Sequence, residues 1–145
     1  MSNRINIVNN ANALKGMLTL EKYIQDSELT PIHKELIKIR TSQINGCAYC
    51  LDMHTKDARK LGETEQRIYT LSAWRETPFF DEKEQAILAL TEEITLISKG
   101  GVSDDTYNKA AAVLGDAYLA QVYMAIITIN AWNRIAIGTK MEPAA

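Results

Sequence analysis

Apolar residues recur every three or four positions along most of the chain, and this period is typical of amphipathic α-helices. The pattern predicts about seven helices, over residues 11–25, 31–44, 47–61, 64–75, 82–98, 103–114 and 117–138. No segment alternates apolar and polar side chains as a half-buried strand does. The sequence therefore predicts an all-α fold, and the absence of a βαβ pattern argues against a thioredoxin fold.

The helix ends are marked by residues that suit the unpaired backbone groups of a terminal turn. We expect N-caps at Thr30 (with Pro31 as the first helical residue), Thr64, Asp81 and Ser103 or Asp104. We expect the helices to end at Gly62, Thr77-Pro78, Gly100-Gly101 and Gly115. The residues after 138, Met141 to Ala145, should form a loose tail.

The apolar stripes indicate which face of each helix is buried. Residues 31–44 should turn Leu36, Ile37 and Ile39 inward. The segment 82–98 carries a regular apolar series, formed by Ile87, Leu90, Ile94 and Ile97. Residues 117–138 are apolar around most of the helix, so this element should either thread the core or form a subunit interface.

Composition is ordinary for a globular protein and excludes several classes of function. With 145 residues, 46% hydrophobic and 23% charged, the chain should form a single domain over residues 1–145. A net charge of −2 with both signs interspersed gives no reason to expect a nucleic-acid or membrane partner. We find no secretory signal, and polar residues interrupt the longest apolar region, 117–137. We therefore expect a cytoplasmic protein.

The chemistry-bearing residues gather in Cys47-Ala48-Tyr49-Cys50-Leu51-Asp52-Met53-His54, which holds both cysteines and one of the two histidines. On a helix, Cys47, Cys50 and His54 fall within a sector of roughly 60°. Asn45-Gly46 precedes them, so the site should lie where a helix begins, and a helix N-terminus lowers a thiol pKa. We expect an inward stripe of Cys47, Cys50, Leu51, His54, Ala58 and Leu61.

Three simpler interpretations compete with thiol redox chemistry. The cysteines could be buried apolar residues, or a structural disulfide, although such a short loop stabilises a fold little. They could also form half of a zinc site, but zinc prefers four protein ligands. The chain offers only His54 and His33 besides the thiols, and a carboxylate would have to complete the set. We expect neither a metal nor a cofactor, with His33 at the surface.

The motif resembles the core of the alkylhydroperoxidase D (AhpD)-like proteins of the carboxymuconolactone decarboxylase superfamily. The resemblance continues through residues 55–62, and Glu35 stands twelve residues before Cys47, as the family glutamate does. Residues 129–134, Ile-Asn-Ala-Trp-Asn-Arg, resemble the last helix of the family. The similarity covers roughly residues 30–138 and implies an all-α domain of six to seven helices that assembles into trimers or hexamers.

The resemblance also implies a peroxidase mechanism. The second cysteine, Cys50, would attack a hydroperoxide, the first, Cys47, would resolve it, and a dithiol reductant of protein or lipoyl type would restore the pair. Glu35 and His54 would form the proton relay. The helix dipole alone would favour Cys47 as the reactive thiolate, since it lies nearer the helix N-terminus.

One position departs from the family pattern. AhpD carries a histidine immediately before the second cysteine, and Tyr49 stands there in this chain. A phenol, with a pKa of about 10, is a poorer base near neutral pH than an imidazole of about 6.5. The peroxidase could therefore be weak, and Tyr49 could contribute only its hydroxyl. Two alternatives stay open, a disulfide oxidoreductase or redox sensor and a non-catalytic helical oligomer. Decarboxylation is disfavoured, because that branch usually lacks the cysteine pair.

Overall fold

The computed structural model describes residues 3–145, and its regular elements are all helical. The α-helices are α1 (Ala11–Gln25), α2 (Pro31–Asn45), α3 (Ala48–Lys60), α4 (Glu65–Thr70), α5 (Glu82–Thr95), α6 (Asp104–Leu114) and α7 (Asp116–Gly138). Three short 3₁₀ helices join them, at Ile7–Asn9, Leu71–Glu76 and Ile97–Lys99. The all-α prediction is thus confirmed over these residues.

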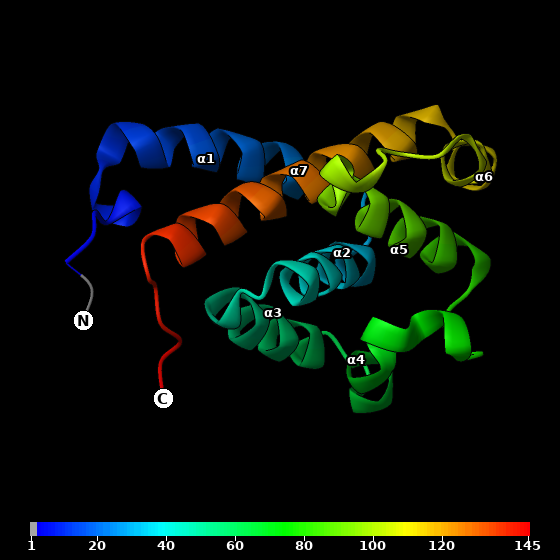
Figure 1. Cartoon of the computed structure of the whole chain (residues 1–145), viewed down its shortest axis with the longest axis horizontal. Helices are drawn as coiled ribbons and strands as arrows, with labels where there is room; N and C mark the ends of the chain where they lie inside the picture. The colour runs from blue at the N-terminus through cyan, green and yellow to red at the C-terminus, as the bar shows by residue number, and fades with distance from the viewer. Residues whose placement is uncertain (1–2) are drawn as a thin grey trace.

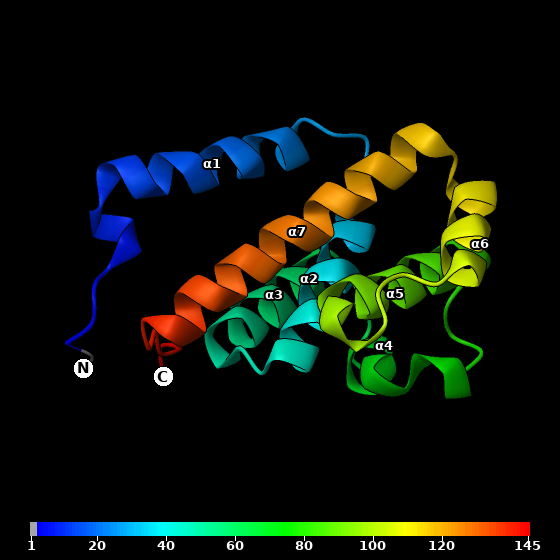
Figure 2. The same cartoon turned by 45° about the horizontal axis from the view of Figure 1, so that its top comes forward.

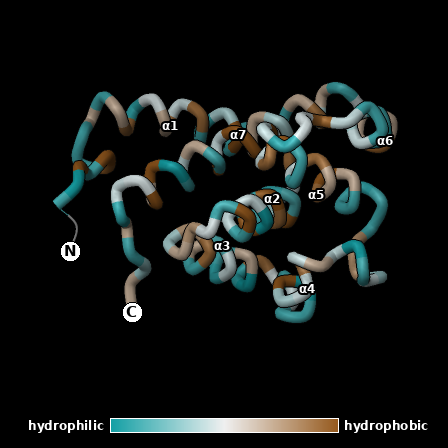
Figure 3. The backbone as a smooth tube through the Cα atoms, in the orientation of Figure 1, coloured by the Kyte–Doolittle hydropathy of each residue, from teal (hydrophilic) through white to brown (hydrophobic). Residues whose placement is uncertain are grey.

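The long helix α7 runs through the middle of the molecule (Figures 1 and 2). It packs against α1 on one side and against α2, α3 and α5 on the other, and α6 joins α5 to α7 at one end. Hydrophobic residues recur along α2, α5 and α7 (Figure 3), and Ile37, Ile87 and Ile126 of these helices are buried in one apolar cluster. No helix among residues 3–145 combines the length and hydropathy needed to cross a membrane.

The predicted caps are present and explain where the helices begin. The Thr30 hydroxyl accepts a hydrogen bond from the His33 backbone N–H (3.1 Å), with Pro31 as the first residue of α2. Asp81 and Glu84 form a reciprocal capping box at the start of α5. The Thr64 and Ser103 hydroxyls cap α4 and α6 by accepting from the Arg67 and Thr106 backbone N–H groups. Local side-chain chemistry therefore sets these boundaries.

The helix predicted over 64–75 is wrong in its second half. The α-helical turns stop at Thr70, and the chain continues as a 3₁₀ helix in which Ala73 has non-helical angles (φ −123°, ψ 32°). Leu71 and Trp74 are both buried in the cluster around Leu36 and Leu88. The break has a packing reason, because it lets both side chains enter the core.

Two other expected inward positions are also wrong. Ile97 is 56% exposed, because α5 ends at Thr95 and the chain tightens into a 3₁₀ turn before Gly100. Leu61 is 48% exposed, because it is the C-cap of α3, where the chain leaves the helix. In both cases the apolar period of the sequence continues past the last residue of the α-helix.

The core consists of two main apolar clusters that share α2 and α5. Ile37 joins Ile87, Leu90 and Ile126 in the first, while Leu36 and Ile39 pack in the second. The three α2 residues are at most 1% exposed, as the sequence predicted. Helix α2 therefore lies between the two clusters, and its C-terminus leads directly into the cysteine motif.

His33 is half-buried and contacts α7 instead of projecting freely from the surface. Its Nδ1 lies 2.7 Å from the Tyr118 hydroxyl of α7, which also accepts from the Thr30 backbone N–H at 3.1 Å. The Tyr118 hydroxyl has one proton of its own, which it donates to Nδ1 when the ring is the neutral tautomer with its proton on Nε2. Burial lowers the pKa of His33 below the ordinary 6.5, more strongly than Glu84 and Asp81 raise it.

This arrangement predicts a pH dependence of stability. Because the folded pKa lies below the unfolded value, the unfolded chain binds more protons as the pH falls below about 6.5, and folding is weakened until the folded pKa is passed. The variant His33→Gln, which keeps an acceptor for Tyr118, should show a flatter stability curve between pH 7 and 5. Urea unfolding at several pH values would measure this. Identical slopes in the two proteins would show that His33 is not the source.

Candidate functional site

The turn between α2 and α3 places the cysteines. Gly46, the C-cap of α2, has a left-handed conformation (φ 72°) that suits glycine. Its backbone N–H and that of Cys47 both donate to the Ser42 carbonyl, at 2.9 and 3.0 Å. Helix α3 begins one residue later, at Ala48, with Cys47 as its N-cap. The motif therefore lies at a helix N-terminus, as the sequence predicted.

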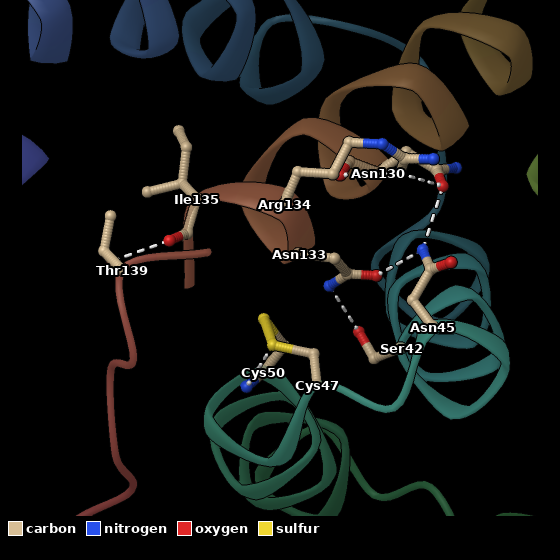
Figure 4. Close-up of a disulfide and its surroundings, with 9 residues drawn as sticks. All are labelled: Ser42, Asn45, Cys47, Cys50, Asn130, Asn133, Arg134, Ile135 and Thr139. Atoms are coloured by element: carbon tan, nitrogen blue, oxygen red, sulfur yellow. Dashed lines mark hydrogen bonds between the residues drawn. A yellow bond between two sulfur atoms is a disulfide. The ribbon is translucent and has the colours of Figure 1, made fainter. Parts of the chain in front are cut away.

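The two cysteines form a disulfide (Figure 4). The Cys47 sulfur also accepts a hydrogen bond from the Cys50 backbone N–H at 3.3 Å. Cys47 is 1% exposed and Cys50 3%, and both pack against Ala136 of α7. The positive end of α3 thus points at Cys47, an arrangement that favours a thiolate there when the pair is reduced.

A network of amide side chains attaches this turn to α7 (Figure 4). The fully buried Asn133 donates from Nδ2 to the Ser42 hydroxyl at 3.1 Å. Asn45 in turn donates from Nδ2 to the side-chain oxygens of Asn130 (2.9 Å) and Asn133 (3.0 Å). Asn133 belongs to the segment 117–138, which was expected to thread the core or form an interface, and its side chain lies in the core.

Glu35 and His54 meet across α2 and α3, as the resemblance implied. His54 Nδ1 lies 3.3 Å from Glu35 Oε2, and the side chains are only 13% and 10% exposed. The other carboxylate oxygen, Oε1, lies 3.7 Å from Lys38 Nζ. Neither Glu35 Oε2 nor His54 Nδ1 has an aligned hydrogen-bond partner among the described residues. The pair is within contact distance but poorly aligned for a hydrogen bond.

Asp57 is a further acidic neighbour that the sequence analysis missed. Its Oδ2 lies 3.9 Å from His54 Nδ1, and its side chain is 45% exposed. The available signal was the i, i+3 spacing from His54, which puts two side chains on neighbouring parts of a helix. His54 therefore has one carboxylate neighbour on α2 and another on its own helix, α3.

A cavity of about 350 Å³ opens beside these groups. Its walls are formed by Glu21, Lys38, Tyr49, Cys50, Met53, His54, Asp57, Trp132, Ala136 and Met141. Cys50 is among the lining residues, whereas Cys47 lies behind it and is not. The half-buried Tyr49 shares the wall with Cys50, while His33 belongs to the contact with Tyr118 and takes no part.

Two cavity residues come from distant parts of the chain and were not predicted as site residues. Trp132, which the sequence placed in the core or an interface, donates from Nε1 to Glu21 Oε1 of α1 at 2.8 Å. Met141, expected in a loose tail, packs against the cysteine pair. The apolar part of the wall therefore combines α3, α7 and the segment after α7.

The arrangement combines a redox-active type of cysteine pair with an acid–base pair at one cavity. A dithiol with this spacing can exchange two electrons, and one of its sulfurs is at the cavity wall. A carboxylate next to an imidazole can hold and pass a proton. The same nitrogen and oxygen atoms are also potential metal ligands.

The sequence is similar to a described protein family along more than half its length. A profile of the Carboxymuconolactone decarboxylase family (CMD) matches residues 11–93. Uncharacterized protein YdfG of Bacillus subtilis (strain 168) is 48% identical over 125 residues, which cover 86% of this chain and 85% of that protein.

Solved structures agree with this assignment. The protein ATU0492 from Agrobacterium tumefaciens, described as of unknown function and proposed as an antioxidant defence protein AhpD, is 39% identical. It matches with a TM-score of 0.95, over 100% of this chain and 99% of that chain. An AhpD-core, peroxidase-related protein from Ralstonia eutropha JMP134 shares only the fold (TM-score 0.81, 16% identity, covering 95% and 74% of the two chains). The chain therefore belongs to the carboxymuconolactone decarboxylase family, as an AhpD-like member.

Proposed function

We propose that the protein is a thiol-dependent peroxidase that reduces alkyl hydroperoxides through Cys50 and Cys47. The observation that carries this proposal is the position of the disulfide, with Cys50 at the cavity wall and Cys47 buried behind it. Only Cys50 is placed to meet a substrate in the cavity. The apolar walls from Met53, Trp132 and Met141 suit the organic part of a hydroperoxide.

The reaction proceeds in two steps on the reduced protein. The Cys50 thiolate attacks the terminal oxygen of the hydroperoxide, so that the S–O bond forms, the O–O bond breaks and the alkoxide leaves as an alcohol after taking a proton. The Cys47 thiolate then attacks the sulfenic acid sulfur of Cys50. The S–S bond forms, and the released hydroxide takes a proton to give water.

The same geometry supports the return step. A dithiol donor entering the cavity would attack Cys50, and Cys47 would leave as a thiolate. The N-cap position of Cys47 stabilises that leaving thiolate, because α3 directs its positive end and the Cys50 backbone N–H at this sulfur. Cys47 thus acts as the resolving and leaving sulfur, and the dipole argument no longer conflicts with Cys50 as the peroxide-reactive one.

In this mechanism His54 takes the Cys50 proton, and Glu35 orients and tunes the imidazole from the other side. The 3.3 Å contact between His54 Nδ1 and Glu35 Oε2 supports this pairing. Lys38 balances part of the charge of Glu35 through its contact with Oε1. Tyr49 lines the cavity next to Cys50, where its hydroxyl is a candidate donor to the departing alkoxide.

The cysteine roles predict different trapping in the two single variants. After one addition of cumene hydroperoxide to reduced protein, Cys47→Ser should accumulate a sulfenic acid that dimedone labels, and Cys50→Ser should not. The wild type should lose two thiols for each peroxide consumed and turn over with a suitable dithiol donor. Mass spectrometry and thiol counting measure both. Equal labelling of the two variants would refute the assignment, and thiol exchange without peroxide consumption would favour the disulfide oxidoreductase.

The relay predicts that His54 controls both the rate and its dependence on pH. His54→Gln should slow single-turnover thiol oxidation by about 10²–10⁴ and remove the limb on which the wild-type rate rises with pH, because the titrating base is gone. Glu35→Gln should slow thiol oxidation less than His54→Gln does, because Glu35 acts through the imidazole. The matched control is His33→Gln, the same change at the histidine outside the cavity, which should keep the wild-type profile. A wild-type rate and profile in His54→Gln would make this histidine purely structural.

We also propose that the protein assembles into a trimer or hexamer. In the single chain, α1 leaves Leu18 51% and Tyr23 44% exposed, and α7 leaves Ile127 45% and Ile137 43% exposed. Helix α1 lies along α7 and away from the other long helices (Figure 2). A second copy covering this apolar surface would bury these side chains.

Assembly can be tested by sedimentation equilibrium at micromolar concentration. The wild type should sediment as a trimer or hexamer, and Leu18→Glu should shift the protein toward smaller species by placing a charge in the apolar contact. Gln66→Glu adds the same negative charge to an exposed position of α4 and should leave the mass unchanged. A stable wild-type monomer would remove the proposal.

A further inference from the structure

Glu35, His54 and Asp57 lie close together, and His54 and Asp57 also line the cavity. One ligand-type atom from each, a carboxylate oxygen or an imidazole nitrogen, lies within 4.8 Å of the other two. Glu35 comes from α2, and the other two come from successive turns of α3. Glu35 Oε2 and Asp57 Oδ2 lie 3.3 and 3.9 Å from His54 Nδ1.

The convergence leaves two buried atoms without the partners that such atoms normally have. Glu35 Oε2 and His54 Nδ1 make no hydrogen bond among the described residues, although they lie 3.3 Å apart. The Glu35 side chain is only 10% exposed, and its Oε2 is the oxygen directed at His54. Buried polar atoms are rarely unpaired, so this pair of atoms points to a bound group between them.

The spacing suits a small divalent metal ion. Zinc binds nitrogen and oxygen ligands at about 2.0–2.2 Å in a tetrahedron, which separates neighbouring ligand atoms by roughly 3.3–3.6 Å. His54 Nδ1 lies 3.3 Å from Glu35 Oε2 and 3.9 Å from Asp57 Oδ2. The three ligand atoms lie within 4.8 Å of one another, so the half-exposed Asp57 side chain would have to turn toward Glu35 and His54 to complete three ligand positions. A fourth would face the cavity.

The charges of the three side chains also suit a divalent cation. Two carboxylates and a neutral imidazole match the charge of a divalent cation, and imidazole selects zinc-like metals over magnesium or calcium. Lys38 lies beside the cluster, and its Nζ contacts the other oxygen, Oε1, of Glu35 at 3.7 Å. Glu35 therefore keeps Oε2 as a single ligand atom.

We propose that Glu35, His54 and Asp57 form a binding site for Zn²⁺ beside the cysteine pair. The site does not need the thiols, so it is available in the disulfide form. Where the relay proposed above operates, a metal on Nδ1 would take the place of the Glu35 contact and hold the imidazole. Zinc would then act as an inhibitory ligand of the same cavity, a consequence that rests on the proposed function.

Binding can be decided on the oxidised protein, in which the disulfide removes both thiolates as ligands. Isothermal titration with Zn²⁺ should give one site per chain. His54→Gln and Asp57→Asn should each weaken it at least about tenfold. The matched control is Asp52→Asn, which removes one carboxylate from α3 at a position paired with Lys56, and should change affinity less than about twofold. Co²⁺ in the same site should show visible bands without an intense thiolate band.

Either of two results would overturn the site. One is the absence of Zn²⁺ binding to the oxidised wild type at millimolar metal. The other is unchanged affinity in both His54→Gln and Asp57→Asn, which would place the metal elsewhere. Asp57→Asn remains informative if His54→Gln folds poorly, since Asp57 is half exposed. The titration contains no peroxide and no reduced thiol, so its outcome is independent of whether the peroxidase proposal holds.

Discussion

The buried amide of Asn133 is the interaction on which the geometry of the site depends. It bonds to Ser42 and Asn45, and so attaches the last turn of α2 to the middle of α7. Ser42 also receives two backbone N–H groups from the turn through its carbonyl. Leaving such a buried donor or acceptor unpaired costs about 1–3 kcal/mol for each group. The network therefore holds the turn, and with it Cys47, in one position against Ala136.

This constraint makes the two sulfurs chemically different. With the turn attached to α7, Cys47 becomes the N-cap of α3 and lies under the helix, while Cys50, one turn further on, reaches the cavity. The helix end then stabilises negative charge on the buried sulfur, and the cavity gives access to the other one. In the proposed mechanism, the resolving and attacking roles would both follow from this single backbone geometry, with Cys50 as the sulfur that meets the substrate.

Much of this architecture was predictable because it depends on neighbours in sequence. The caps at Thr30, Asp81 and Ser103 bond within their own first turns, and the cysteine spacing is fixed by one helix. The helix predicted over 64–75 was wrong where a tertiary contact overrode the local period, whereas Ile97 and Leu61 were wrong because the helix ended before the apolar period did. The break at Ala73 exists to bury Trp74, and no residue nearby in the sequence specifies that demand.

The site was predictable only as far as single helices or the family resemblance define it. The contact of Glu35 with His54 depends on how α2 crosses α3, and the sequence offered it only through the family spacing. The sequence analysis missed three cavity residues, because a charged residue on an amphipathic helix usually faces solvent. They are Asp57, Lys38 and Glu21. Whether such a residue instead faces a cavity depends on the angle between helices. A hydrophobic pattern records which side of a helix is buried, and it does not record which charged residues at the edge of that side meet across an interface. That is why Asp57, Lys38 and Glu21 required the structure, whereas the cysteine pair and, through the family resemblance, Glu35 and His54 did not.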